Sequence, residues 1–256
     1  QELFILDLLS NYQWDRPLHL LSQGGDLNVG LKDYLMYEGY SSRFVPIRNK
    51  ITSTSPGLVD IDELYDKVMN VYTWDAISRK DFDVDYQNYY TFLGVLPQRE
   101  IFATTASELL KAGDKERALK VLDKGMASMP ADVWPLESVP LGFTTNDLMV
   151  IAMVKDYYLA GAPDKASAIA RKMGDDLLTA AHFYMQFYDY ASSDFETVYQ
   201  LACYLIDEVD KGGDKELSDT LKAGLYGIVK TGAEMYSESE QKSGDTSGTH
   251  NPPISN

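Results

Sequence analysis

A helix–turn–helix pattern recurs three times along this chain, and it constrains the fold more than any other feature. In each copy an apolar, helically periodic stretch ends at a glycine, at Gly113, Gly161 and Gly213, and a second periodic stretch follows directly. Glycine can adopt the left-handed conformation that ends a helix, and an aspartate such as Asp114 or Asp214 can cap the next helix. A helical hairpin cannot bury its apolar stripe alone, so neighbouring hairpins stack. The pattern therefore predicts a mainly α-helical repeat fold.

The glycines also indicate where the hairpins lie, because each one marks a turn between two helices. They are 48 and 52 residues apart, which is longer than the about 34 residues of a tetratricopeptide repeat. We therefore expect tetratricopeptide-like hairpins stacked into a short solenoid, within a repeat domain at 93–236. The expected helices are 97–112 with 115–128, 145–160 with 164–173, and 194–210 with 214–236, plus an aromatic helix at 175–190.

The N-terminal part has a different pattern. We expect a small α/β unit at 1–50, in which two short strands, at 18–21 and 43–47, flank a helix at 31–37 as a β-α-β unit. A connector at 51–92 holds one helix, at about 60–72, capped by Asp60 or Asp62. Residues 237–256 contain few apolar side chains, so we expect a disordered tail.

Charge and composition exclude several classes of function. The 39 Asp and Glu residues exceed the 23 Lys and Arg residues, which gives a net charge of -16. Nucleic acid is excluded as a partner because phosphate binding needs clustered cations. The sequence has no apolar run of about 18 residues, so we expect no direct membrane insertion by this segment.

Few residues are available for metal or cofactor chemistry. Cys203 is the only cysteine, and the three histidines, His19, His182 and His250, are far apart in the sequence. Neither a cysteine-based zinc site nor a histidine site is therefore expected. The alternating aspartates at 81–85 lack the glycine and glutamate of a calcium loop. We predict no catalytic residues, no metal and no cofactor.

Two sets of side chains are possible binding groups. Many of the 18 tyrosines lie at helical positions, where most should be half-buried packing residues, but some can line a groove for a peptide or sugar. The groove candidates are Arg99, Tyr157, Tyr158, Tyr184 and Tyr188. An alternative is a soluble enzyme with a polar site between the α/β unit and the repeats. Its candidates are Arg16, Asp26, Glu38 and Arg43, although salt bridging and turn formation explain them more simply.

Three stretches together carry a resemblance to a known family. They are Trp14-Asp15-Arg16-Pro17-Leu18-His19, then Leu31 to Leu35 with the stretch EGYSSRFVPI at 38–47, and the hairpin Gly113 to Pro130. In this order the chain resembles the C-terminal region of a family of multi-spanning membrane proteins common in Bacteroidetes (DUF2723). That family is similar to an animal protein O-mannosyltransferase with a membrane-embedded glycosyltransferase fold. The resemblance covers about residues 1–130.

The resemblance implies a role without catalysis for this chain, because the catalytic acid of such transferases lies in a loop between membrane helices. The implied function is an extracytoplasmic accessory domain on the periplasmic face of the inner membrane, tethered through an N-terminal membrane region. Its implied partners are an acceptor protein or peptide and the membrane domain of its own parent chain. The amphipathic helix that directly follows Gln1-Glu2 has no preceding cap, which fits a fragment of a longer chain or a processed terminus. The alternative function is a stand-alone helical-repeat scaffold for protein–protein interaction.

Overall fold

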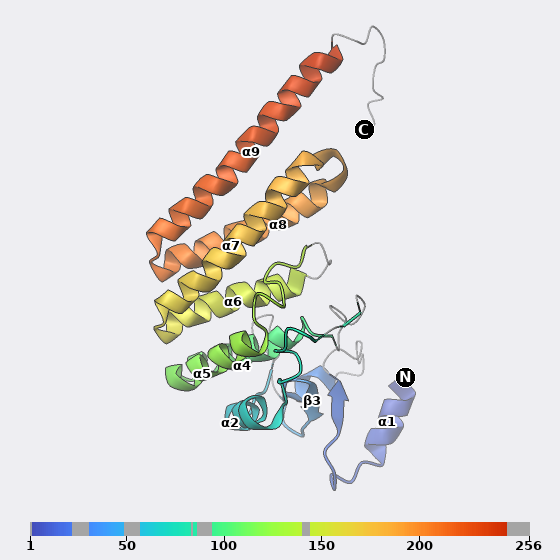
Figure 1. Ribbon diagram of the computed structural model, residues 1–256. Coiled ribbons are helices and arrows are strands. Elements are labelled where there is room, and N and C mark those ends of the chain that lie inside the picture. The colour runs from blue at the N-terminus through green and yellow to red at the C-terminus, as the bar shows by residue number, and fades with distance from the viewer. Residues whose placement is uncertain are drawn as a thin grey trace. The chain divides into compact units, whose positions relative to one another are not determined.

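A computed structural model describes most of the chain and confirms a mainly helical fold with a small sheet before the helices. The described residues are 2–21, 31–48, 57–82, 84–85, 94–139 and 144–244. The chain divides into two compact units, residues 1–166 and residues 167–256. Figure 1 shows the elements in chain order from blue to red.

The first unit holds the sheet and the first helices. Its elements are α1 (Glu2–Ser10), β1 (His19–Leu21), the 3-10 helix η1 (Leu31–Tyr34), β2 (Leu35–Tyr37), β3 (Ser41–Phe44), α2 (Ile61–Asp66), the π-helical η2 (Lys67–Val71), α4 (Gln98–Lys111), α5 (Lys115–Ser128) and α6 (Thr144–Ala160). Helix α7 (Pro163–Gln186) continues into the second unit, which also contains α8 (Tyr188–Gly212) and α9 (Lys215–Gly244).

The three strands form an antiparallel sheet in the order β1-β3-β2, not a β-α-β unit. The helix expected at 31–37 is only a 3-10 turn that runs into β2. Three residues link β2 to β3, and Gly39 among them has a φ of +89°. So short a link can join only antiparallel strands, because a parallel crossover needs a dozen or more residues.

The connector contains the expected helix, and Asp60 is its cap. The Asp60 side chain accepts a hydrogen bond from the backbone N–H of Glu63 at 3.1 Å. After η2 the chain turns at Trp74, whose indole N–H donates to the carbonyl of Val68 at 3.0 Å. The Trp74 ring lies 4.4 Å from the ring of Phe102 in α4. The connector is therefore packed onto the first helical hairpin.

Helices α4, α5 and α6 pack together, and the expected first hairpin is confirmed. Gly113 has a φ of +83°, and Asp114 caps α5 by accepting from the backbone N–H of Arg117 at 2.9 Å. The two helices approach closely at Gly125, where a β-carbon would lie 2.8 Å from Cγ of the fully buried Phe102. A larger residue at this position would push the helices apart.

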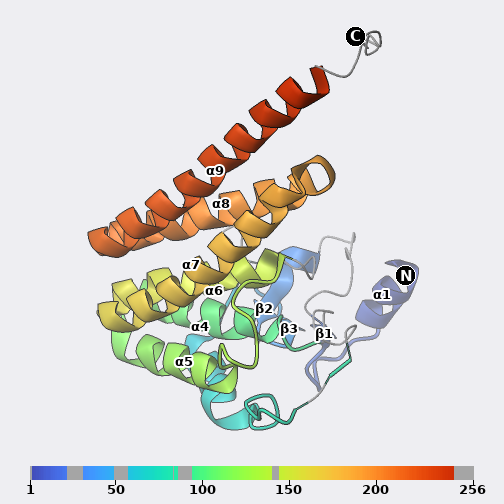
Figure 2. The same cartoon turned by 45° about the horizontal axis from the view of Figure 1, so that its top comes forward.

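In the second unit, α7 is longer than expected. The sequence predicts one helix at 164–173 and another at 175–190, but α7 continues through Gly174 and ends at Gln186. Gly174 remains helical because it packs on α9, where a β-carbon would lie 2.5 Å from the side chain of Leu221. Figure 2 shows α7, α8 and α9 as three long helices.

Helix α9 also extends further than expected, to Gly244. Residues 237–244 of the expected disordered tail are therefore helical, because no proline or glycine interrupts this stretch before Gly244. The rest of that tail lies outside the described residues. Within the part of the chain that the structure describes, no helix is both long and apolar enough to cross a membrane.

Candidate functional site

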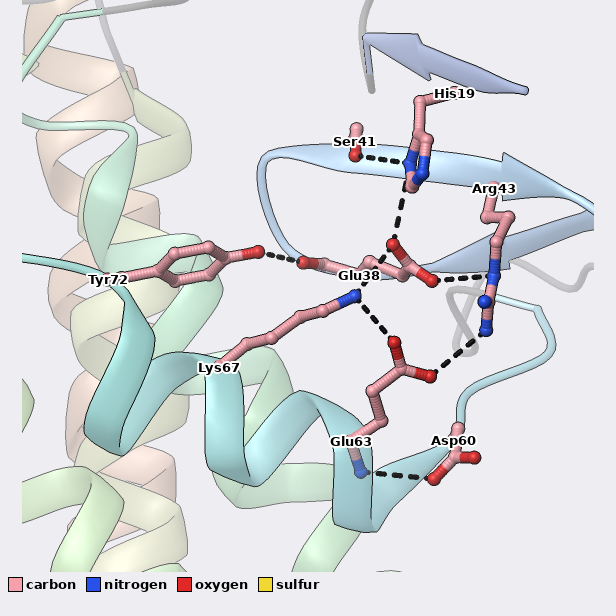
Figure 3. Close-up of polar contacts among 8 residues, drawn as sticks. All are labelled: His19, Glu38, Ser41, Arg43, Asp60, Glu63, Lys67 and Tyr72. Atoms are coloured by element: carbon pink, nitrogen blue, oxygen red, sulfur yellow. Dashed lines mark hydrogen bonds and ion pairs between the residues drawn. The ribbon is translucent and has the colours of Figure 1, made fainter. Parts of the chain in front are cut away.

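A cluster of charged side chains lies where the small sheet meets α2. Its centre is Glu38, which is only 4% exposed. One carboxylate oxygen lies 2.8 Å from Nε of Arg43, and the other lies 2.8 Å from Nζ of Lys67. The same second oxygen is 3.5 Å from Nδ1 of His19 on β1. Figure 3 shows that these groups converge on Glu38 from two strands and one helix.

A second carboxylate completes the cluster. Glu63 accepts from Nη2 of Arg43 at 3.0 Å and pairs with Nζ of Lys67 at 2.8 Å. The hydrogen bond from Lys67 lowers the pKa of Glu63, against a smaller opposing effect of burial, and the charges of Lys67 and Arg43 lower it further. Burial opposes the charge of Lys67, but its hydrogen bonds to Glu38 and Glu63 outweigh burial and raise the pKa of Lys67. The pairing between Glu63 and Lys67 therefore favours the charged form of both side chains.

Local sequence explains how the cluster is assembled. Glu63 and Lys67 are four residues apart on a helix, which places them on the same face. Arg43 lies on β3, and Glu38 lies in the turn that Gly39 allows between β2 and β3. The hydroxyl of Tyr72 donates to the backbone carbonyl of Glu38 and fixes that turn against the end of η2 (Figure 3).

The arrangement is that of a clamp rather than a reactive centre. A general base must be able to receive a proton from a substrate, and a carboxylate that already pairs with two cations is a poor base. The cluster instead ties β1, β3 and the β2–β3 turn to the connector helix. Breaking one partner of a buried ion pair leaves an uncompensated charge, so this clamp should be intolerant of substitution.

The polar enzyme candidates are only partly brought together. Glu38 and Arg43 are in contact, as their predicted salt-bridging role requires. Arg16 is exposed, and its backbone carbonyl accepts from the hydroxyl of Tyr12. Asp26 lies outside the described residues. The partners that the sequence interpretation missed are His19, Glu63, Lys67 and Tyr72, and of these only the Glu63–Lys67 spacing gave a signal.

A second polar cluster is buried beneath the first hairpin and is centred on Arg99. The side chain of Arg99 donates at 2.6 to 3.3 Å to the backbone carbonyls of Met129, Trp134 and Pro135, and at 2.8 Å to Oδ1 of Asn146. Arg99 is 1% exposed. It therefore anchors the loop that follows α5 and does not face a groove.

Asp147 lies beside this anchor, in the first turn of α6. Its carboxylate accepts from the backbone N–H of Ser138 at 2.9 Å and from the Ser138 hydroxyl at 2.6 Å. Burial raises the pKa of Asp147 to about 6, although the Ser138 hydrogen bonds and the charge of Arg99 oppose the shift. An acid in such surroundings titrates near neutral pH, but both of its oxygens are already engaged by the loop.

Two of the four tyrosine candidates lie in α6 of the first unit, and two lie in the second unit. Tyr157 is almost fully buried, and its hydroxyl donates to Oδ1 of Asp123 at 3.1 Å. Tyr158 is half-buried beside it in α6. In the second unit, Tyr184 packs edge-on against Phe183 and Tyr188 packs edge-on against Phe195. Tyr157, Tyr184 and Tyr188 therefore pack against neighbouring side chains.

No metal site is found in the described part of the chain, where no group of three or more His, Cys, Asp or Glu side chains is placed to hold an ion. Asp81 instead pairs with Arg79, whose Nε lies 2.8 Å from its Oδ1.

Comparison with known proteins gives one match. Residues 1–63 match a family model described as TMEM260-associated domain 2. No curated protein and no solved structure matches the chain. The matched residues make up about a quarter of the chain, and they include all three strands and the Glu38, Arg43 and Glu63 side chains of the clamp. In its first 63 residues, the chain is similar to TMEM260-associated domain 2.

Proposed function

We propose that this chain is a non-catalytic, extracytoplasmic accessory domain of a membrane-embedded glycosyltransferase-like protein, whose reaction is protein O-mannosylation. In this role the helical hairpins present a surface to an acceptor protein or to the membrane domain of the same parent chain. The chain uses no cofactor and no metal, and it does not bind nucleic acid. It lies at the periplasmic face of the inner membrane, tethered through an N-terminal membrane region.

One observation carries the proposal. The residues that match the TMEM260-associated model are those that build most of the Glu38 clamp. The clamp pairs its carboxylates with Arg43 and Lys67 and offers no free base. A segment of this kind supports a brace between elements better than it supports chemistry.

The proposal is tested in the natural gene. The reading frame upstream of the Gln1 codon should encode several apolar stretches of about 20 residues, long enough to span a bilayer. The full-length protein should transfer a sugar from a lipid-linked donor to a Ser/Thr-rich acceptor, and deletion of this chain should abolish transfer while the membrane domain still binds the donor. An upstream frame without such stretches, or full transfer after the deletion, would refute it.

A stand-alone scaffold is the second possible function. The observation that favours it is the set of exposed aromatic side chains in the second unit, where Tyr190 is 93% and Tyr226 71% exposed. Aromatic residues are enriched at protein interfaces. A scaffold should form a stoichiometric complex with a defined soluble protein in the absence of any membrane fraction, whereas an accessory domain should not.

A further inference from the structure

The turns of the hairpins α4–α5 and α8–α9 contain the same backbone hydrogen bonds, and the residues that form them differ by 100 in number. The backbone N–H of Asp114 donates to the carbonyl of Leu109 at 2.9 Å, and the backbone N–H of Asp214 donates to the carbonyl of Val209 at 3.2 Å. Gly113 and Gly213 have φ values of +83° and +92°. Each hairpin can therefore be compared with the other position by position.

In the first hairpin, α6 packs against both α4 and α5. Three contacts mark this seat. Arg99 donates to Asn146 at 2.8 Å, and Ser107 donates to Asp156 at 2.5 Å. A β-carbon on Gly125 would lie 3.2 Å from the end of the Met153 side chain. The three α6 residues are Asn146, Met153 and Asp156, whose spacings of seven and three positions place them on one face of the helix.

In the second hairpin, the counterparts of these seat residues line an open groove. Positions 99, 107 and 125 correspond to Tyr199, Asp207 and Leu225, and all three line a groove of about 410 Å³ between α8 and α9. Every residue that lines the groove comes from these two helices. Its floor is mainly apolar, formed by Cys203, Ile206, Leu225 and Val229.

Exposure follows the same division. Met129 is fully buried, whereas its counterpart Val229 is 37% exposed. Arg99 is 1% exposed, whereas its counterpart Tyr199 is 40% exposed. Tyr199 and Val229 are thus more exposed than their counterparts in the first hairpin, whereas Leu225 stays buried at 5%.

We propose that the α8–α9 groove is the seat of an amphipathic helix from a partner protein, with an apolar stripe and a lysine or arginine facing Asp207. We expect a helix in the α8–α9 groove because the corresponding surface of α4 and α5 binds the helix α6. The basic residue follows from charge, since α6 faces a hydroxyl at Ser107, whereas the α8–α9 groove has a carboxylate at Asp207. Asp207 also pairs with Lys211 of its own helix at 2.6 Å, but both side chains are more than half exposed. An exposed pair of this kind contributes little, so the carboxylate can still attract a second cation. A helix that carried an acid there, as α6 carries Asp156, would place two carboxylates against each other.

The sequence of residues 245–256 does not have the pattern of such a helix. The twelve residues after α9 include Pro252 and Pro253 and only one aliphatic residue, Ile254. They therefore have no apolar stripe at helical spacing. The inference deepens the proposed accessory function, on which it rests for the identity of the partner.

The experiment uses the full chain and the α6 sequence as a probe. Two synthetic peptides cover residues 144–160, one with the natural sequence and one with Asp156→Lys. Cys203 lines the groove and is the only cysteine of the chain, so its alkylation rate reports occupancy of this site alone. We expect the D156K peptide to slow alkylation at least about tenfold at saturation, and the natural peptide to bind about tenfold more weakly.

Two variants of the chain provide the matched controls. Tyr226→Asp places a carboxylate on an exposed groove residue and should remove protection of Cys203. Tyr204→Asp changes a tyrosine that is 54% exposed on α8 and does not line the groove, and it should leave protection unchanged. Circular dichroism confirms that both variants keep their helices.

Three outcomes would overturn the proposal. These are an unchanged alkylation rate with saturating D156K peptide, equal effects of the two tyrosine variants, and protection of Cys203 on concentrating the chain alone, which would make a second copy the occupant. The result is separable from the test of the proposed function. A peptide-binding groove in a chain with no membrane-spanning parent would sustain the helix seat and refute the accessory role.

Discussion

The Glu38 clamp and the Arg99 anchor bury charge in two different ways. In the clamp, the Glu38 carboxylate meets the cations of Arg43 and Lys67. In the anchor, the guanidinium of Arg99 meets neutral oxygens from three backbone carbonyls and Asn146. The clamp therefore joins separate elements by ion pairs, whereas the anchor holds one loop by dipoles.

This difference changes the pKa of the acidic side chain in each region. Glu63 in the clamp has a lowered pKa because of Lys67, while Asp147 beside the anchor has a pKa raised to about 6 because of burial. Opposite charge keeps the first acid ionised, and hydrogen bonds from Ser138 do not fully compensate the burial of the second. The clamp should thus depend on salt and the anchor region on pH.

The largest effect is expected from breaking the anchor. Arg99→Met would leave the carbonyls of Met129, Trp134 and Pro135 without this donor inside the protein, and it should lower the free energy of unfolding by about 3–5 kcal/mol. All three tryptophans lie in the first unit, so urea unfolding followed by tryptophan fluorescence measures the effect there. Arg171→Met, at an exposed position, is the control and should change stability by less than about 0.5 kcal/mol. Equal effects of the two variants would contradict the anchor role.

A smaller effect is expected from breaking the clamp. Glu38→Gln removes the charge that compensates Arg43 and Lys67, and it should cost about 2–3 kcal/mol in low salt. Lys67 is partly exposed, so water compensates part of the loss and added salt should reduce the effect. The double variant E38Q/K67M should be more stable than the sum of the single variants predicts. Additive single effects would show that the two residues do not act as a pair.

The third effect, which reaches the size of the clamp effect only at the upper end of its pH window, is a pH dependence at Asp147. Between about pH 4 and 6 the folded state holds a proton on Asp147 that the unfolded chain, with a carboxyl pKa of about 3.9, has lost. This group therefore makes stability fall as pH rises through that window, by up to about 2–3 kcal/mol. Asp147→Asn should remove this part of the slope in unfolding measurements at pH 4, 5, 6 and 7. Asp75→Asn, at an exposed position, should keep the slope, and an unchanged slope in D147N would sink the prediction.

Local sequence was sufficient for the helical hairpins. Gly113, Gly161 and Gly213 all adopt positive φ, and Asp114 and Asp214 cap the helices that follow. A left-handed glycine and an aspartate cap act within one turn of the chain, so their effect can be read without any tertiary contact. The cap at Asp60 was predictable for the same reason.

The candidate sites were predicted less well because they depend on residues that are distant in the sequence. Glu38 and Arg43 were grouped correctly, but Lys67 meets Glu38 only after the connector folds back on the sheet. Arg99 and Tyr157 look like surface groups by residue type, yet packing of α6 buries both. Residue type gives the tendency of a side chain to be exposed, and only packing decides its exposure.

By itself, the sequence determined that this protein is built of glycine-ended, aspartate-capped helical hairpins after a small β-containing segment. The tertiary structure decided the antiparallel order of the strands, the continuation of α7 through Gly174, and the side chains that surround Glu38. It also decided that one of two matching hairpins holds a helix while the other leaves its groove open. The physical reason is the distance along the sequence over which each interaction acts. Caps and turns are determined by residues next to one another in the chain, whereas strand pairing, close packing and burial are determined by residues that are far apart in the sequence.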